Sequence, residues 1–178
     1  MRATNRSMQT STEHITILGV GNILLTDEGI GVRVIEQLAN RYDFDPNVEL
    51  VDGGVLGIRL MGVISQSDIL IVVDAVHNND EPGSLYRLAD EQVPRRMLAK
   101  QSMHQMDLPE VLALCAAVDK VPQHIVVIGV EPLDTATLSV DLSPVVAARM
   151  DALITMVLDE LDRMGAGYCL KNTTYPQN

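Results

Sequence analysis

The stretch "DILIVVDAV" at residues 68–76 is the clearest strand in the sequence, and it decides the fold class. It has five consecutive apolar residues, 69–73, between two aspartates. A strand that is apolar on both faces has to be covered on both faces, which is typical of parallel sheets. Strands are also predicted for four other short apolar runs, at residues 14–20, 48–54, 83–89 and 124–131. The run at 83–89 suits the edge of a sheet.

Helical patterns alternate with these strands. Helices are predicted for residues 31–42, 55–66 and 108–118, where apolar residues recur every three or four positions. A last helix is expected to run to about Met164, with Ser143 as its N-cap residue and Pro144 at its first position. Strands alternating with helices predict an α/β fold, a three-layer α/β/α sandwich around a mainly parallel sheet.

The chain has 178 residues, which suits one compact domain. We expect a single α/β domain at 14–164, between a flexible N-terminal tail at 1–13 and a C-terminal tail at 165–178. The first 13 residues contain no apolar segment of the kind found in a secretory signal. No uninterrupted apolar run reaches about 18 residues, so no membrane span is expected.

The overall charge and the cysteines limit the function classes. The net charge of −11 argues against a nucleic-acid partner or an anionic membrane surface, because both are negative. It suits a partner that is basic or that presents a metal. Cys115 lies in an apolar helical pattern and Cys169 in a polar tail. A disulfide is therefore not expected, and a reducing, cytoplasmic location is predicted.

Acidic residues follow the predicted strands. In a parallel sheet, ligands bind at the carboxyl ends of the strands. Asp27 and Glu28 follow the first strand, Asp52 ends the second and Asp74 ends the third, soon followed by His77. We expect these side chains to share one edge of the sheet.

His104 lies in a loop that leads into the helix at Leu108, so it can face the same crevice. Two carboxylates and one imidazole suit a divalent transition metal, and Glu28, Asp74 and His104 are therefore the candidate ligands. Structural roles are the alternatives. Asp27 could cap the helix that follows it, Glu28 could be a first-turn acid favoured by the helix dipole, and Asp74 could be a solvated loop residue.

A nucleotide site is the competing interpretation of "GVGNIL" at residues 19–24, which begins like a dinucleotide-binding loop. The third glycine of that motif would fall at Leu24 and is absent. Asp27 and Glu28 would also repel a pyrophosphate at the start of the helix. A nucleotide cofactor is therefore not predicted.

Several segments together resemble a known family. The stretch "GVGNILLTDEGIGV" at 19–32 is similar to the N-terminal signature of the bacterial hydrogenase maturation endopeptidases, which process the large subunit of nickel–iron hydrogenases. Further similar segments follow in the family's order: "VDGG" at 51–54, "ILIVVDAV" at 69–76, "HQ" at 104–105 and "IGVEP" at 128–132. The resemblance covers about residues 14–164.

The resemblance implies a twisted, mainly parallel five-stranded sheet and removal of a C-terminal extension from the hydrogenase large-subunit precursor after nickel insertion. It also implies that Glu28, Asp74 and His104 bind metal, and it matches Asp52 to an aspartate of the family's Asp-Gly motif. The expected metal is nickel held by the precursor, with another divalent ion as the alternative in the isolated protein. A monomer is expected, because the precursor has to reach the crevice.

The predicted mechanism leaves several routes open. Docking on the nickel would position the scissile bond. The ion could polarise the carbonyl or activate a water, or a carboxylate such as Asp52 could act as general base, as in an aspartyl protease. The sequence contains no GxSxG or HExxH motif. Two other functions remain as alternatives, a different metal-dependent hydrolase and a non-catalytic nickel-binding chaperone.

Overall fold

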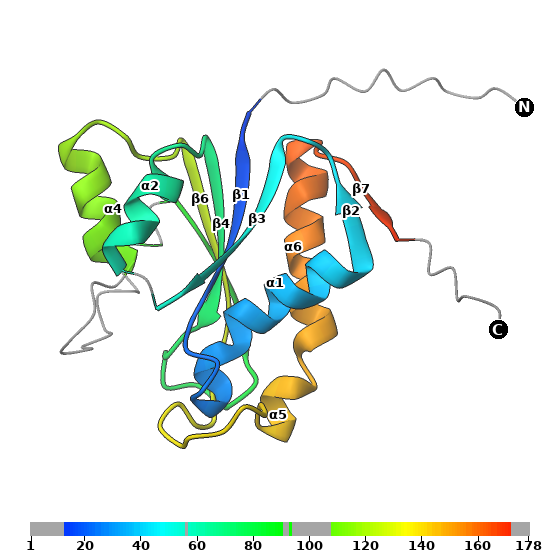
Figure 1. Cartoon of the computed structure of the whole chain (residues 1–178). Helices are drawn as coiled ribbons and strands as arrows, with labels where there is room; N and C mark the ends of the chain where they lie inside the picture. Colours follow the sequence, from blue (N-terminus) through cyan, green and yellow to red (C-terminus); the bar gives the residue numbers. More distant parts are fainter. Residues whose placement is uncertain (1–12, 56, 91–92, 94–107, 172–178) are drawn as a thin grey trace, which may run out of the picture.

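The computed structural model describes residues 13–55, 57–90, 93 and 108–171. Figure 1 shows one sheet with helices on both of its faces. The predicted N-terminal tail lies outside these residues except for Glu13, and the loop that carries His104 lies outside them entirely.

The central sheet has five strands in the order β3-β1-β4-β6-β5. β1, β3, β4 and β6 run parallel to one another, and the edge strand β5 is antiparallel to β6. This confirms the predicted mainly parallel five-stranded sheet and the edge position of residues 83–89. The strand bounds are β1 Ile15–Val20, β3 Val48–Gly54, β4 Ile69–Ala75, β5 Leu85–Ala89 and β6 His124–Val130.

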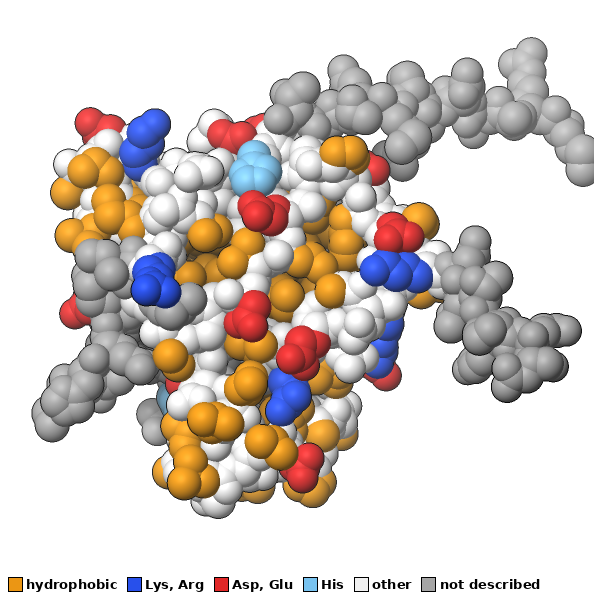
Figure 2. Space-filling view, viewed as in Figure 1, with side chains coloured by type: hydrophobic (Ala, Val, Ile, Leu, Met, Phe, Trp, Pro, Cys, Tyr) orange, Lys and Arg blue, Asp and Glu red, His pale blue; other side chains and the backbone are white. Residues whose placement is uncertain are grey.

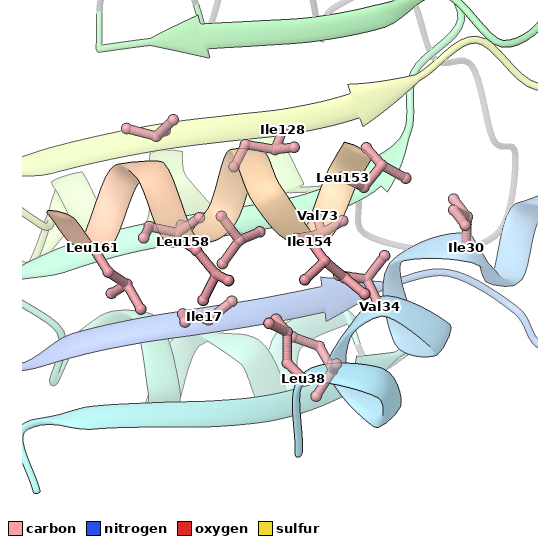
Figure 3. Close-up of a cluster of buried hydrophobic side chains, with 14 of the residues drawn as sticks. Ile17, Ile30, Val34, Leu38, Val73, Ile128, Leu153, Ile154, Leu158 and Leu161 are labelled. Atoms are coloured by element: carbon pink, nitrogen blue, oxygen red, sulfur yellow. The ribbon is translucent and has the colours of Figure 1, made fainter. Parts of the chain in front are cut away.

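Two hydrophobic cores lie on the two faces of the sheet. On one face, Ile71 and Val73 of β4 pack in a cluster with α1 (Ile30–Arg41) and α6 (Met150–Met164). Figure 3 shows this cluster, in which side chains of α1 and α6 lie beside those of β1, β4 and β6. On the other face, Leu70 and Val72 pack in a cluster that contains residues of the two helices α2 (Leu60–Ile64) and α4 (Leu108–Ala117). Successive side chains of a strand point to opposite faces, so an all-apolar strand serves both cores.

Two predicted helices differ in detail. The segment predicted as one helix at 55–66 begins with a short 3₁₀ turn, η2 (Gly57–Arg59), before α2. The last helix is divided into α5 (Pro144–Ala147) and α6. The backbone at Arg149 has φ −95° and ψ −6°, so the helical path is interrupted there. As a result, α5 lies at the end of the sheet while α6 runs along its face (Figure 1).

The chain beyond residue 164 differs from the expected tail. Gly165 ends α6 in the left-handed conformation, with φ +71°. β7 (Tyr168–Leu170) then pairs antiparallel with β2 (Tyr42–Phe44) in a separate two-stranded sheet. The Tyr168 ring packs edge-on against Tyr42, with 5.9 Å between centroids. These aromatic contacts explain why the segment is part of the fold. Among the described residues, no helix has the length and apolar character that a membrane span requires.

Candidate active site at the carboxyl edge of the sheet

The turn that follows β1 is held against the sheet by close backbone packing. An added Cβ atom at Gly31 would lie 2.1 Å from the carbonyl oxygen of Val73 and 2.4 Å from that of Val20. Gly21 has φ +131°, and a Cβ atom there would lie 1.7 Å from the carbonyl oxygen of Glu28. Only glycine fits at these two positions. The glycines of this signature therefore allow the start of α1 to sit directly on β1 and β4.

This packing brings two of the predicted ligand residues to the same edge. Glu28 is half-buried in a 3₁₀ turn, η1 (Thr26–Gly29), which packs against β4. Asp74 is the penultimate residue of β4, and it is buried, with 4% of its surface exposed. One of its carboxylate oxygens accepts the backbone N–H of Ala75 at 2.8 Å. Glu28 and Asp74 thus come from packed elements at the carboxyl edge, as the sequence predicts.

Asp52 lies at the same edge but away from Asp74. Gly19 is in register with Asp52 on one side and with Val73 on the other. Two strand spacings therefore separate Asp52 from β4, which is about 10 Å. Asp52 is exposed, and one of its oxygens accepts the backbone N–H of Gly54 at 2.9 Å.

Asp52 also borders a pocket of about 170 Å³ beside the turn after β1. The pocket lies between the ends of β1 and β3, and neither Glu28 nor Asp74 lines it. Its lining residues are Gly21, Asn22, Ile23, Val32, Asp52, Gly54 and Val55. Asp52 therefore lies beside this pocket and does not share a cluster with Asp74.

Asp27 does not cap the helix after it, which corrects one of the two interpretations of this residue. No side-chain cap is present at the start of α1. The Asp27 side chain is fully buried and instead accepts hydrogen bonds from the loop after β6. The donors are the backbone N–H groups of Leu133, Asp134 and Ser143 and the hydroxyl of Ser143, at 2.8–3.0 Å. Asp27 is therefore a structural anchor between two loops of the edge.

Glu131 is a buried acid at this edge to which sequence reasoning assigned no role, although it lies in the "IGVEP" segment. It accepts the backbone N–H of Asn78 at 2.8 Å and the hydroxyl of Tyr86 at 2.6 Å. Burial opposes ionisation, but these hydrogen bonds outweigh it and hold the pKa of Glu131 below its ordinary value. Burial and the same hydrogen bond raise the pKa of Tyr86. Glu131 thereby holds the loop that follows Asp74.

Of the two candidate histidines, His77 lies within the described residues and His104 does not. His77 is exposed, and its Nε2 atom lies 3.5 Å from the Thr135 hydroxyl. His104 lies outside the described residues. Within the described part of the chain, no three His, Cys, Asp or Glu side chains are grouped so that they could hold a metal ion. The set of Glu28, Asp74 and His104 stays a prediction, with its two carboxylates at one edge.

These features define an α/β/α sandwich whose glycine-rich first turn presents carboxylates at the carboxyl edge of the sheet. Residues 32–160 match the family described as HycI, hydrogenase maturation protease. The chain belongs to the hydrogenase maturation protease family, and it is a peptidase.

Curated relatives agree with this family. The chain is 40% identical over 156 residues to the hydrogenase expression/formation protein HupD of Thiocapsa roseopersicina, covering 87% of this chain and 71% of that protein. It is 40% identical over 152 residues to the hydrogenase 2 maturation protease of Escherichia coli K12, covering 85% and 92% respectively.

Solved structures show the same fold. The hydrogenase maturating endopeptidase HybD from E. coli superposes with a TM-score of 0.84 at 36% identity, covering 90% of this chain and 99% of that chain. The [NiFe] hydrogenase maturation protease HycI from Thermococcus kodakarensis gives a TM-score of 0.67 at 25% identity, with 85% and 95% covered. The α/β/α sandwich expected from the sequence is thus the fold of this family.

Proposed function

We propose that this protein is the endopeptidase that removes the C-terminal extension of a nickel–iron hydrogenase large-subunit precursor. Membership of the maturation protease family supports the reaction class. The observation that carries the site is the placement of Glu28 and Asp74 on packed elements at one edge of the sheet.

The precursor's own nickel is the proposed recognition element. Glu28, Asp74 and His104 are the proposed protein ligands to that ion, because carboxylate and imidazole groups suit a divalent transition metal. Docking on the nickel aligns the adjacent peptide with the carboxyl edge, which is catalysis by proximity and orientation. A precursor without nickel would lack this anchor and would not be cut.

Asp52 is proposed to contact the substrate peptide at the end of β3, beside the turn that follows β1. Its carboxylate borders the pocket between the ends of β1 and β3, and only one of its oxygens is used by the Gly54 N–H. From there Asp52 can hold the substrate or take a proton, as in an aspartyl protease. In either role, Asp52 would not coordinate the nickel.

The proposed setting is a monomer acting in the cytoplasm. Cys115 and Cys169 are both free, which suits a reducing compartment. Burial raises the pKa of the Cys115 thiol, so this buried cysteine is not an activated nucleophile. The absence of an activated thiol at Cys115 is consistent with a mechanism that uses carboxylates and a metal ion.

A cleavage assay tests the proposal. Purified protein is mixed with nickel-loaded precursor, and loss of the C-terminal peptide is followed by mass spectrometry. We expect cleavage of the nickel-loaded precursor and none of a nickel-free precursor. Cleavage of both forms would refute nickel recognition. Binding of the loaded precursor without any cleavage would refute the protease and indicate a nickel-binding chaperone.

A further inference from the structure

Exposed apolar side chains gather at the carboxyl edge. Among the described residues, nine large hydrophobic side chains are exposed, and five of them belong to two short segments of this edge. We call these five the apolar rim: Ile23, Leu24, Leu133, Leu138 and Val140. Leu138 is 80% exposed, the highest value of the nine. Figure 2 shows hydrophobic side chains concentrated at the lower end of the molecule, where Figure 1 places the loop before α5 and the start of α1.

The two segments of the apolar rim are bound to one another. Leu25 and Leu138 form an antiparallel β-bridge, and the Ser139 N–H donates to the Leu24 carbonyl oxygen at 3.0 Å. The Thr26 hydroxyl donates to the Thr137 carbonyl oxygen at 2.9 Å. The rim is therefore a surface built by main-chain contacts, and binding there does not have to order two separate loops.

The apolar rim is continuous with the candidate active site. Leu24 is four residues before Glu28 in the same turn, and Ile23 lines the pocket that Asp52 borders. Asp27 ties Leu133 to that turn through the Leu133 N–H, at 2.9 Å. A chain bound in the pocket beside Asp52 would therefore contact Ile23 of the rim. Contiguous exposed apolar surface of this kind marks a site of interaction with another molecule.

Charge around the apolar rim indicates the chemistry of that molecule. Asp134 lies within the loop segment of the rim, and Asp141 directly follows it. Glu28 lies in the same turn as Ile23 and Leu24, and Asp52 borders the pocket that Ile23 lines. The Arg33 guanidinium also contacts the rim, where it donates to the Val140 carbonyl oxygen. With a net charge of −11 for the whole chain, the edge favours a partner whose apolar contact is surrounded by basic side chains.

We infer that the apolar rim is the docking surface for the hydrogenase large-subunit precursor, and that it receives apolar side chains flanked by basic ones next to the scissile segment. This inference rests on the proposed function and adds the surface through which the substrate is recognised. The rim would bind the precursor equally before and during cleavage, so it would act on affinity and leave the chemical step unchanged.

The test compares Leu24→Asp and Leu138→Asp with Leu170→Asp. Leu170 is 69% exposed on β7, away from the carboxyl edge, and is a matched control for the loss of an exposed leucine and the gain of a charge. Processing of nickel-loaded precursor is measured over a range of precursor concentrations. We expect KM to rise by about tenfold or more in each rim variant, with kcat within about twofold of the wild type. The control should match the wild type, and all three should keep the wild-type Tm.

Direct binding separates this inference from the proposed function. Precursor association is measured by calorimetry with the same proteins, independently of cleavage. If the wild type binds without cutting and the rim variants lose binding, the proposed protease fails and the docking surface stands. If cleavage proceeds with unchanged KM in both rim variants, the docking surface is overturned and the protease stands. A wild-type dimer that the rim variants convert to a monomer, with KM unchanged, would also overturn it and assign the rim to self-association.

Discussion

Asp27 and Ser143 bind each other, although each is placed by the sequence to cap its own helix. The Ser143 N–H and hydroxyl both donate to the Asp27 carboxylate, each at 2.8 Å. No side-chain cap is present at the start of α1 or of α5. The two residues are separated by 116 positions in the chain. This pair joins the turn that contains Glu28 to the loop that leads into α5.

The first prediction concerns this pair. We expect Asp27→Asn to lower the free energy of unfolding by roughly 2–4 kcal/mol, because a buried, charge-assisted acceptor of four hydrogen bonds is lost. Ser143→Ala should cost about 1 kcal/mol, and the double variant should cost less than the sum of the two. Urea unfolding measures all three. Asp159→Asn, an exposed acid of α6, is the control and should match the wild type. Wild-type stability in Asp27→Asn would contradict the anchoring role.

The second prediction concerns the proposed ligands of the precursor's nickel. Glu28→Gln, Asp74→Asn and His104→Ala should each reduce processing by about 10² or more, because each removes a ligand that fixes the scissile bond. Thermal unfolding should show that Glu28→Gln remains folded, since Glu28 is only half-buried. His77→Ala is the matched histidine control, since His77 is exposed at the same edge. Full processing by His104→Ala would end the case for the three-residue site.

The third prediction concerns the packing of α1 on the sheet. Gly31→Ala should destabilise the protein by about 1–3 kcal/mol, because the new Cβ atom has no space beside the Val73 carbonyl. It should also reduce processing, since the turn bearing Glu28 would be displaced. Gly62→Ala is the matched control, because no atom lies within 4 Å of an added Cβ atom there. That change should stabilise α2 by about 0.5–1 kcal/mol and leave processing unaltered. Equal stability of the two variants would show that α1 is not held in this way.

The fourth prediction concerns pH. The folded-state pKa of Glu131 is lowered from its ordinary value of 4.5, so its contribution to stability is present above that value and is lost as the pH falls through the folded pKa. Glu131→Gln should therefore be less stable than the wild type at pH 7, and the difference should shrink in acid below pH 4.5. Urea unfolding at several pH values measures this. Glu81→Gln is the control and should show no such change, because Glu81 is an exposed acid of the loop that Glu131 holds. A difference that persists unchanged into acid would assign the effect of Glu131→Gln to packing.

The elements of this fold were predictable because their signals are local. An all-apolar strand such as residues 69–73 has to be buried on both faces, and α1 repeats its apolar residues at helical spacing. The same logic predicts that Glu28 and Asp74 share one edge, since Glu28 follows one parallel strand and Asp74 lies near the end of another. The short strand β7 was missed, because its partner β2 is more than a hundred residues earlier and only tertiary pairing makes it a strand.

The sequence by itself determined the class of fold, the run of strands and helices, and the edge at which the acids gather, because apolar periodicity and the position of an acid after a strand depend on neighbours along the chain. Only the tertiary structure decided what each acid does there. Asp27 became an anchor, Glu131 came to hold a loop, and Asp52 was separated from Asp74 by two strand spacings. Those outcomes depend on donors brought from distant parts of the chain, and a buried carboxylate takes whichever donors surround it once the chain has folded.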